Sequence, residues 1–214
     1  MDWDWIARNA DDIAFRTWEH VLLTVIAIVI GFAISFCLAL LIRGRPWLEG
    51  PIVAFSGILY TIPSLALFAF LVPFFGTHSP VTAEVALVSY TILILLRNIL
   101  AGLEGVSPDV LEAADGMGYT RWQRLWRVEI PVAIPVIVGG LRIATVTIVG
   151  LVTVTALIGL GGLGYLIVEV GYRRFFLTAT LVGAVGAILL AVIADRGLVL
   201  LQSALTPWAR SRVR

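Results

Sequence analysis

The sequence predicts an all-α polytopic membrane protein with five core transmembrane helices. Of its 214 residues, 60% are hydrophobic and only 14% are charged, whereas a soluble domain usually carries about 25% charged residues. The mean hydropathy is +1.00. Several apolar stretches are long enough to cross a hydrocarbon core, which takes roughly 20 helical residues. The same composition excludes a soluble domain and a disordered chain.

The apolar stretches place five spans in order along the chain. Residues 21–42 and 51–75 supply the first two. The second contains Pro63 and Pro73, and we expect it to kink because an interior proline deletes a backbone hydrogen bond. The remaining spans are residues 81–103, a helix that begins near Val132, and residues 176–200.

A glycine-rich region, residues 143–168, interrupts this series. Gly159, Gly161, Gly162 and Gly164 fit the spacing of a dinucleotide-binding G-x-G-x-x-G sequence, but that site needs a preceding strand and a soluble βαβ unit. We instead expect the helix to break here, with a short re-entrant or interfacial segment before the last span. Irregular backbone at membrane depth is buried or lines a water-filled path, so these glycines are candidates for a translocation path or gate. Six spans are the topological alternative.

The placement of arginine predicts the orientation, because basic residues concentrate on the cytoplasmic side. The chain has no lysine, and nine arginines share one side of a five-span arrangement: Arg43, Arg45, Arg97, Arg121, Arg124, Arg127, Arg210, Arg212 and Arg214. The other side holds Arg8, Arg16, Arg173 and Arg174 beside an acidic N-terminus. We therefore expect residues 1–20 outside, and both the 104–131 loop and the 206–214 tail in the cytoplasm. Trp18, Trp47 and Trp208 flank the spans, as expected of residues at the headgroup level.

The 104–131 loop is the longest polar segment and is predicted to contain two short helices. Ser107 and the proline after it can begin the first helix, which Gly116 and Gly118 can end. Residues 120–123 have the T-x-x-Q form of a capping box and begin the second helix, which Pro131 is expected to end. On these capping signals alone, a folded connecting loop is the simpler interpretation.

The spacing within this loop resembles the EAA loop of binding-protein-dependent ABC importer permeases. Three residues separate Glu112-Ala113-Ala114 from Gly118, and nine more separate that glycine from V-E-I-P at residues 128–131. The family pattern is E-A-A-x3-G-x9-I-x-L-P, so Val128 and Ile130 are apolar replacements. The match covers 20 positions with two fixed gaps.

Other segments make the chain similar to the osmoprotectant branch of these permeases. They are residues 61–67, 96–98, 116–118, 140–142 and 158–164. Permeases of that branch carry glycine betaine, carnitine, choline or proline betaine. A permease for methionine or another amino acid is the alternative. A small secondary transporter is a weaker alternative, because such a protein has no need of an EAA-like loop.

The resemblance implies a transport subunit and not an enzyme. Residues 21–205 would form the permease domain, in the cytoplasmic membrane of a bacterium or archaeon. Glu112, Ala113, Ala114, Gly118 and Pro131 would couple it to an ATPase subunit, which binds the ATP and magnesium. This chain has no G-x-x-x-x-G-K-[ST] phosphate loop, and no cofactor is expected in it. The other implied partners are a second permease copy or paralogue, a separate solute-binding protein and the lipid bilayer, with no nucleic acid.

Few ionisable residues lie within the predicted spans. Arg142 and Pro63 are candidates for the translocation path, although a structural role is the simpler interpretation of Arg142. Four further charged residues, Glu84, Glu169, Asp195 and Arg196, are expected at span boundaries. Tyr60, Tyr90 and Phe70 could stack on a quaternary ammonium or pack between helices. The two histidines, His20 and His78, are too far apart in sequence to suggest a metal site.

Overall fold

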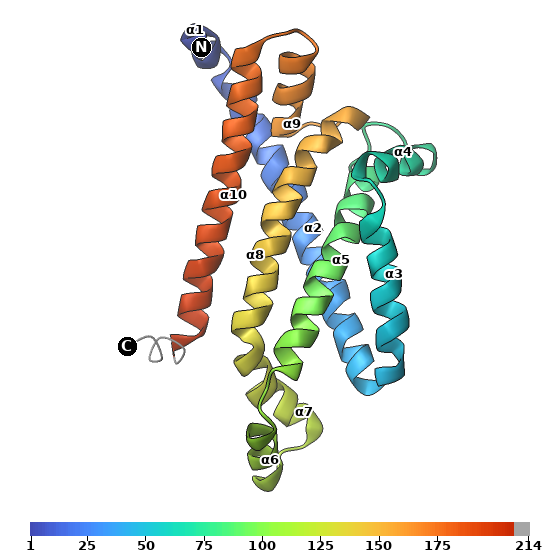
Figure 1. The fold of residues 1–214 in the computed structure, drawn as a ribbon. Helices are drawn as coiled ribbons and strands as arrows, with labels where there is room; N and C mark the ends of the chain where they lie inside the picture. Colours follow the sequence, from blue (N-terminus) through green and yellow to red (C-terminus); the bar gives the residue numbers. More distant parts are fainter. Residues whose placement is uncertain (208–214) are drawn as a thin grey trace.

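A computed structural model describes residues 1–207, which form a bundle of long helices without strands (Figure 1). Four helices are long and apolar enough to cross a membrane: α2 (Ala10–Gly44), α5 (Pro80–Glu104), the continuous helix Arg121–Ile158, and α10 (Leu177–Leu205). A bent pair, α3 (Glu49–Thr61) and α4 (Ser64–Phe75), makes a fifth if it counts as one span. The predicted all-α polytopic fold is confirmed.

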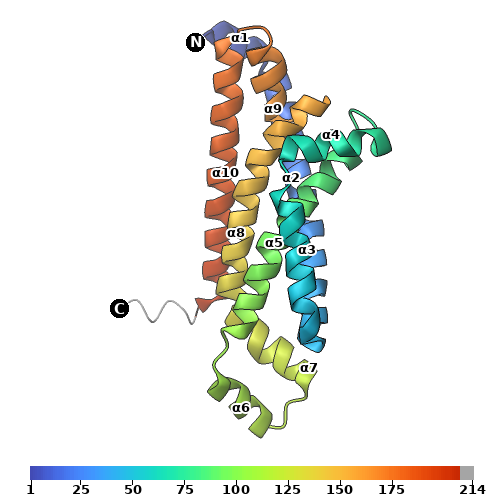
Figure 2. The same ribbon diagram turned by 45° about the vertical axis from the view of Figure 1, so that its right-hand side comes forward.

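The second predicted span is broken at Pro63. The helical segment that ends at Thr61 and α4 are bent by 95° relative to each other. Pro63 disfavours the helical conformation at Ile62, whose ψ is 127°. As a result α4 runs across the end of the bundle and does not continue along α3, as Figure 2 shows. The predicted kink is therefore present and large at Pro63, whereas α4 continues through Pro73.

The first long helix begins earlier than predicted. α2 starts at Ala10 and not near residue 21, after a short helix α1 (Trp3–Arg8). Residues 10–20 contain no helix breaker, and Asp11 and Asp12 suit the positive end of the helix dipole. At about 1.5 Å per residue, the 35 residues of α2 extend for about 52 Å.

Close packing of α5 against α2 and α8 (Ile130–Val154) holds the centre of the bundle. In the apolar part of α5 more than half of the residues are buried. In the corresponding part of α10, which lies at the periphery, the buried share is 17%. Gly31 on α2 lies against Thr91 of α5, and Gly140 on α8 lies against Asn98. A side-chain carbon at either glycine would overlap its neighbour, so small residues permit these close helix contacts.

The glycine-rich region forms short helical pieces between the long helices. After α8 come η3 (Thr155–Ile158), a turn, α9 (Leu163–Tyr165) and the π-helical segment η4 (Leu166–Tyr172). The apolar helix Leu163–Tyr172 would extend for only about 15 Å, too short to cross a core of about 30 Å. This arrangement fits the predicted break and gives no support to six spans.

The two ends of the bundle carry different features. The N-terminus, α4 and α9 lie at one end, and α6 (Pro108–Gly116) and α7 (Arg121–Arg124) extend from the other (Figure 1). The connection η1 (Pro46–Leu48) between α2 and α3 also lies toward the second end. Most of the predicted tail, with Trp208 and the three arginines used for the orientation, lies outside the described residues.

Candidate functional site

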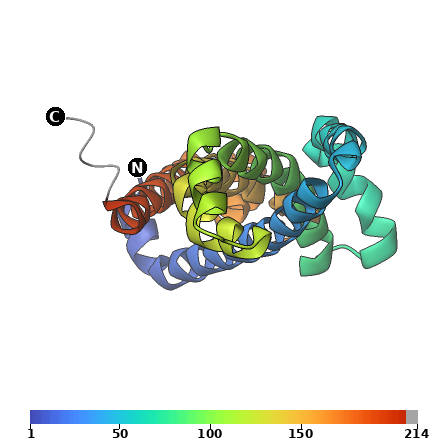
Figure 3. The ribbon, with the colours of Figure 1, turned by 90° about the horizontal axis from the view of Figure 1, so that it is seen from below.

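The predicted loop forms two short helices beyond the end of the bundle. α6 and α7 are joined by residues 117–120. Seen from that end, both helices lie in front of the long helices (Figure 3). The segment that resembles the EAA loop is therefore the outermost part of the chain on this side.

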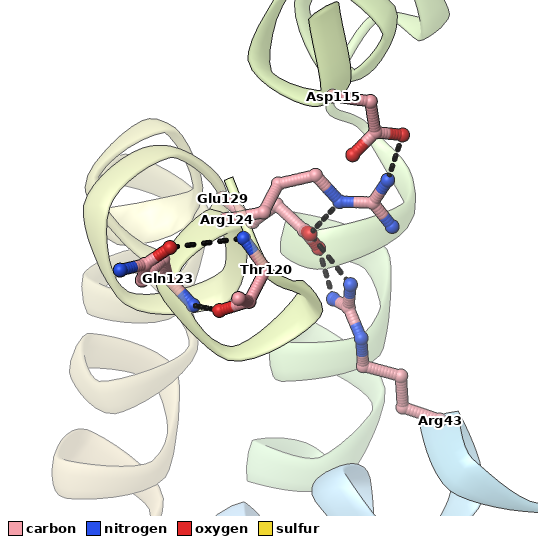
Figure 4. Close-up of polar contacts among 6 residues, drawn as sticks. All are labelled: Arg43, Asp115, Thr120, Gln123, Arg124 and Glu129. Atoms are coloured by element: carbon pink, nitrogen blue, oxygen red, sulfur yellow. Dashed lines mark hydrogen bonds and ion pairs between the residues drawn. The ribbon is translucent and has the colours of Figure 1, made fainter. Parts of the chain in front are cut away.

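Local signals form these helices largely as predicted. The Thr120 hydroxyl accepts from the Gln123 N–H at 3.3 Å, and the Thr120 N–H donates to the Gln123 side chain at 2.9 Å, which completes the capping box (Figure 4). Gly118 has a φ of +79°, a conformation that favours glycine, and its N–H donates to the Asp115 carbonyl. Ser107 occupies the N-cap position of α6, but its side chain makes no capping hydrogen bond.

The second helix of the loop does not end at Pro131, so this prediction was wrong. The helix continues from Arg121 to Ile158. Just before the proline, η2 (Leu125–Glu129) is π-helical, and the Ile130 N–H donates to the Leu125 carbonyl five residues earlier. In an α-helix the proline ring would crowd the carbonyl four residues earlier, and a wider turn relieves this. The loop therefore continues into α8 without a break.

The three residues Glu112, Ala113 and Ala114 differ in accessibility. Glu112 and Ala113 are exposed, whereas Ala114 is only 1% exposed. α6 packs on α7 and η2, so Ala114 belongs to the contacts that hold the loop together. Of the two alanines only Ala113 is accessible, and the coupling role of both stays a prediction. Large apolar side chains are also exposed on the loop, at Met117 and Trp122.

A buried carboxylate connects the loop to α2. Glu129 forms a bidentate ion pair with Arg43, in the last turn of α2, and also accepts from Arg124 Nε at 3.0 Å (Figure 4). Arg124 in turn donates to Asp115, at the end of α6, at 2.5 Å. The Glu129 side chain is only 3% exposed, so its charge needs these two cations.

At the opposite end, two residues of α2 hold the glycine segment. The Gly162 N–H donates to Glu19 at 3.1 Å, and the Leu163 N–H donates to His20 Nδ1 at 3.3 Å. Because Nδ1 accepts, the proton lies on His20 Nε2, which donates to the Val149 carbonyl of α8 at 3.0 Å. His20 is fully buried and so joins α2, α8 and α9.

Close contacts explain the glycines of this segment. A side-chain carbon at Gly164 would overlap the backbone of Thr153, and one at Gly161 would overlap the Glu19 carboxylate. Gly159, with a φ of +82°, lies against the His78 ring. The element before this segment is a helix and not a strand, so the dinucleotide-binding hypothesis has no structural support. A role of these glycines in a gate stays a prediction.

At the break before α4, a side chain from a neighbouring helix forms a hydrogen bond with a backbone carbonyl that the bend leaves free. The Tyr90 hydroxyl, from α5, donates to the carbonyl of Ile62. Breaks of this kind persist in membranes where a neighbouring helix supplies the missing hydrogen bond. The Tyr60 and Tyr90 rings meet edge to face, with centroids 6.0 Å apart. Tyr90 therefore has a structural role at the bend.

We expect Tyr90→Phe to destabilise the bend without displacing the rings. The substitution removes one hydrogen bond, which is worth about 1 kcal/mol. The unfolding midpoint in detergent should fall by a few degrees, measured for the purified chain. Ser89→Ala is the matched control, because Ser89 bonds only to a carbonyl of its own helix, that of Val85. An unchanged midpoint for Tyr90→Phe would contradict this role.

Arg142 is paired within the helical bundle. Its Nε and Nη2 donate to the two carboxylate oxygens of Asp195, at 2.7 and 3.1 Å. Asp195 lies within α10, and the pair joins α8 to α10, while the place of Asp195 at a span boundary stays a prediction. This favours the structural interpretation of Arg142. By contrast, both carboxylate oxygens of Glu84 are buried with no hydrogen-bond partner among the described residues.

The residues that connect distant segments were not predicted from the sequence. In the sequence Glu129 occupies a variable position of the loop pattern, and Glu19 and His20 lie just before the first predicted span. The signal that could have identified them is a charged or imidazole side chain inside or next to an apolar helix, because such a side chain needs a polar partner. Arg43 lies 86 residues from Glu129, and Leu163 lies 143 residues from His20, so spacing in the sequence alone does not reveal these contacts. Among residues 1–207, no group of three or more His, Cys, Asp and Glu residues could hold a metal ion.

Comparison with known proteins identifies the family. The chain belongs to the binding-protein-dependent transport system inner membrane components, which it matches over residues 27–207. It is 35% identical over 202 residues to the glycine betaine/carnitine/choline transport system permease protein OpuCB of Bacillus subtilis, covering 94% of this chain and 92% of that one. It is 37% identical to the osmoprotectant import permease protein OsmW of Salmonella typhimurium, covering 93% and 94%. The chain is therefore a transport subunit and a multi-pass protein of the cell membrane.

Solved structures support the fold. A chain of the inward-facing MetNI methionine ABC transporter superposes with a TM-score of 0.81 and 24% identity, covering 91% of this chain and 96% of that one. An amino acid ABC transporter gives the same TM-score at 18% identity. At this level of identity the likeness extends to the fold alone.

Proposed function

We propose that this chain is the permease subunit of an ABC importer for a compatible solute: glycine betaine, carnitine, choline or proline betaine. The observation that carries the proposal is the 112–131 loop. It has the spacing of an EAA loop and forms two exposed helices at one end of the bundle. The names of the relatives, which are 33–37% identical over nearly the full chain, support this substrate class. A methionine or other amino-acid permease has weaker support, because that likeness is structural only.

The partners follow from this assignment. An ATPase subunit binds and hydrolyses ATP with magnesium, a second permease copy or paralogue completes the translocation path, and a separate protein delivers the solute. The N-terminus and the glycine segment face the outside, and α6 and α7 face the cytoplasm, in agreement with the arginine distribution.

The loop would transmit the movement of the ATPase to the spans. Glu112 and Ala113 are exposed on α6 and would meet the ATPase directly, beside the apolar surface of Met117. Ala114, Gly118 and Pro131 would act through the shape of the loop and its connection to α8. Since cores and interfaces switch between discrete packings, a displaced α6 would change which side of the bundle is open.

Uptake by the complete transporter tests the substrate assignment. The chain is co-expressed with an ATPase, a second permease and a solute-binding protein from its own organism, in cells that lack other betaine uptake, and the accumulation of radiolabelled glycine betaine is measured. Unlabelled carnitine or choline should compete, and methionine should not. Competition by methionine alone would replace the substrate class but leave the transporter class intact.

A further inference from the structure

The backbone connects the loop that contains α6 and α7 directly to only two long helices, α5 before it and α8 after it. α5 leads into α6 through residues 105–107, and α7 continues through η2 into α8. A displacement of α6 therefore reaches α5 and α8 through the backbone. α2 is the third helix of the central packing, and its last turn can respond to the loop only through side chains.

The Glu129 ion pairs supply that connection. The carboxylate is reached from α2 by Arg43 and from α7 by Arg124, which also contacts Asp115 at the end of α6. The four side chains thus form one chain of contacts from α6 to α2 (Figure 4). Exposure falls from 54% for Asp115 through 20% for Arg124 to 3% for Glu129 and is 30% for Arg43, so both contacts of Glu129 are better shielded from water than the contact with Asp115.

The π-helical segment η2, which contains Glu129, also packs directly against α2. Glu129 is the last residue of η2, where the hydrogen-bond pattern widens by one residue. Such turns are uncommon and are often found at functional sites. Leu125, in the same segment, packs in the apolar cluster that contains Ala39 and Ile42 of α2. Trp126 of η2 meets Phe36 of α2, with ring centroids 5.9 Å apart. Leu125 and Trp126 of η2 therefore pack against α2 beside the ion pair.

We propose that Glu129 is a positioning residue that transmits movement of α6 and α7 to α2 through Arg43. The inference rests on the proposed function and deepens it: three spans respond to the ATPase, two through the backbone and α2 through the ion pair. Loss of the pair leaves the surface of α6 intact, so the ATPase still binds and hydrolyses ATP. Transport per ATP falls, because α2 no longer follows the loop.

The ratio of glycine betaine transported to ATP hydrolysed tests this proposal. The assembled transporter is reconstituted in liposomes with its binding protein, for wild type, Arg43→Gln and Glu129→Gln. Each variant should lower the ratio at least about tenfold, because it breaks the bidentate Arg43–Glu129 pair and the loss of a single charge-assisted hydrogen bond already corresponds to about tenfold. ATPase co-purification should stay within about twofold of wild type, since the docking surface is unchanged. Arg43→Lys keeps the charge and should recover part of the ratio.

Arg45→Gln is the matched control, since it removes an exposed charge two residues away. It should leave the ratio unchanged. A wild-type ratio in either Gln variant would overturn the proposal, as would an equal fall in Arg45→Gln, which would indicate a general charge effect. If Arg43→Gln does not accumulate, Glu129→Gln decides, because the amide keeps the shape of the buried side chain. A wild-type complex with no ATP-driven uptake would instead contradict the proposed function.

Discussion

Gly118→Val is expected to reduce solute uptake strongly while the protein still inserts in the membrane. Gly118 has a φ of +79°, and a non-glycine residue in such a conformation costs about 1–3 kcal/mol, with a β-branched residue at the upper end. The strain would rearrange the turn between α6 and α7. At about 1.4 kcal/mol per decade, we expect a roughly ten- to hundredfold loss of ATPase association. Co-purification of the ATPase and uptake in the same membranes measure both effects.

Gly116→Ala is the matched control for this prediction. Gly116 lies two residues earlier, and a side-chain carbon there would meet nothing within 4 Å. This variant should bind the ATPase and transport at wild-type rates. If Gly118→Val does the same, the loop is only a connector between α5 and α8.

Gly164→Val is expected to prevent accumulation of folded protein. The reason is a steric clash. The first side-chain carbon would lie 2.7 Å from Cα of Thr153, a backbone atom that cannot move away by a change of rotamer. α9 would have to move away from α8, and the hydrogen bond from the Leu163 N–H to His20 would break with it. Overpacking of this kind typically costs about 1–3 kcal/mol, and the lost buried hydrogen bond adds about 1 kcal/mol.

Yield and thermal unfolding in detergent check this expectation. Gly150→Val is the control, because Gly150 also lies near the end of α8 but faces open space. A Gly164→Val protein with the yield and unfolding midpoint of the control would show that the glycine segment is not closely packed. The position of the Gly161 and Gly162 backbone against Glu19 would then be in doubt as well.

The sequence was informative wherever local chemistry determines structure. The length of the apolar runs predicted the spans, because a helix must satisfy its backbone across about 30 Å of hydrocarbon. The Thr120 capping box and Gly118 predicted the two helices of the loop, since their hydrogen bonds join residues three or four apart. Pro63 predicted the break in the second span for the same reason, although not its angle of 95°.

The sequence was less informative wherever distant segments meet. Pro131 read as a stop signal because its local effect is to break a helix, but the π-helical turn before it accommodates the ring. Ala114 gave no sign that it would be buried. Arg43 and Glu129 were classified separately, as a span-end arginine and a variable loop position, and only the fold shows that they form one ion pair. The same holds for Arg142 and Asp195.

Transport by defined sets of purified subunits tests the central claim most directly. Liposomes are prepared with the permease pair alone, with the ATPase added, and with both the ATPase and the external binding protein, and radiolabelled glycine betaine uptake is measured with ATP inside. We predict no uptake above background for the permease alone, with or without an ion gradient, and uptake when all components and ATP are present. Robust uptake by the permease alone, driven by an ion gradient, would contradict the account and identify a secondary transporter.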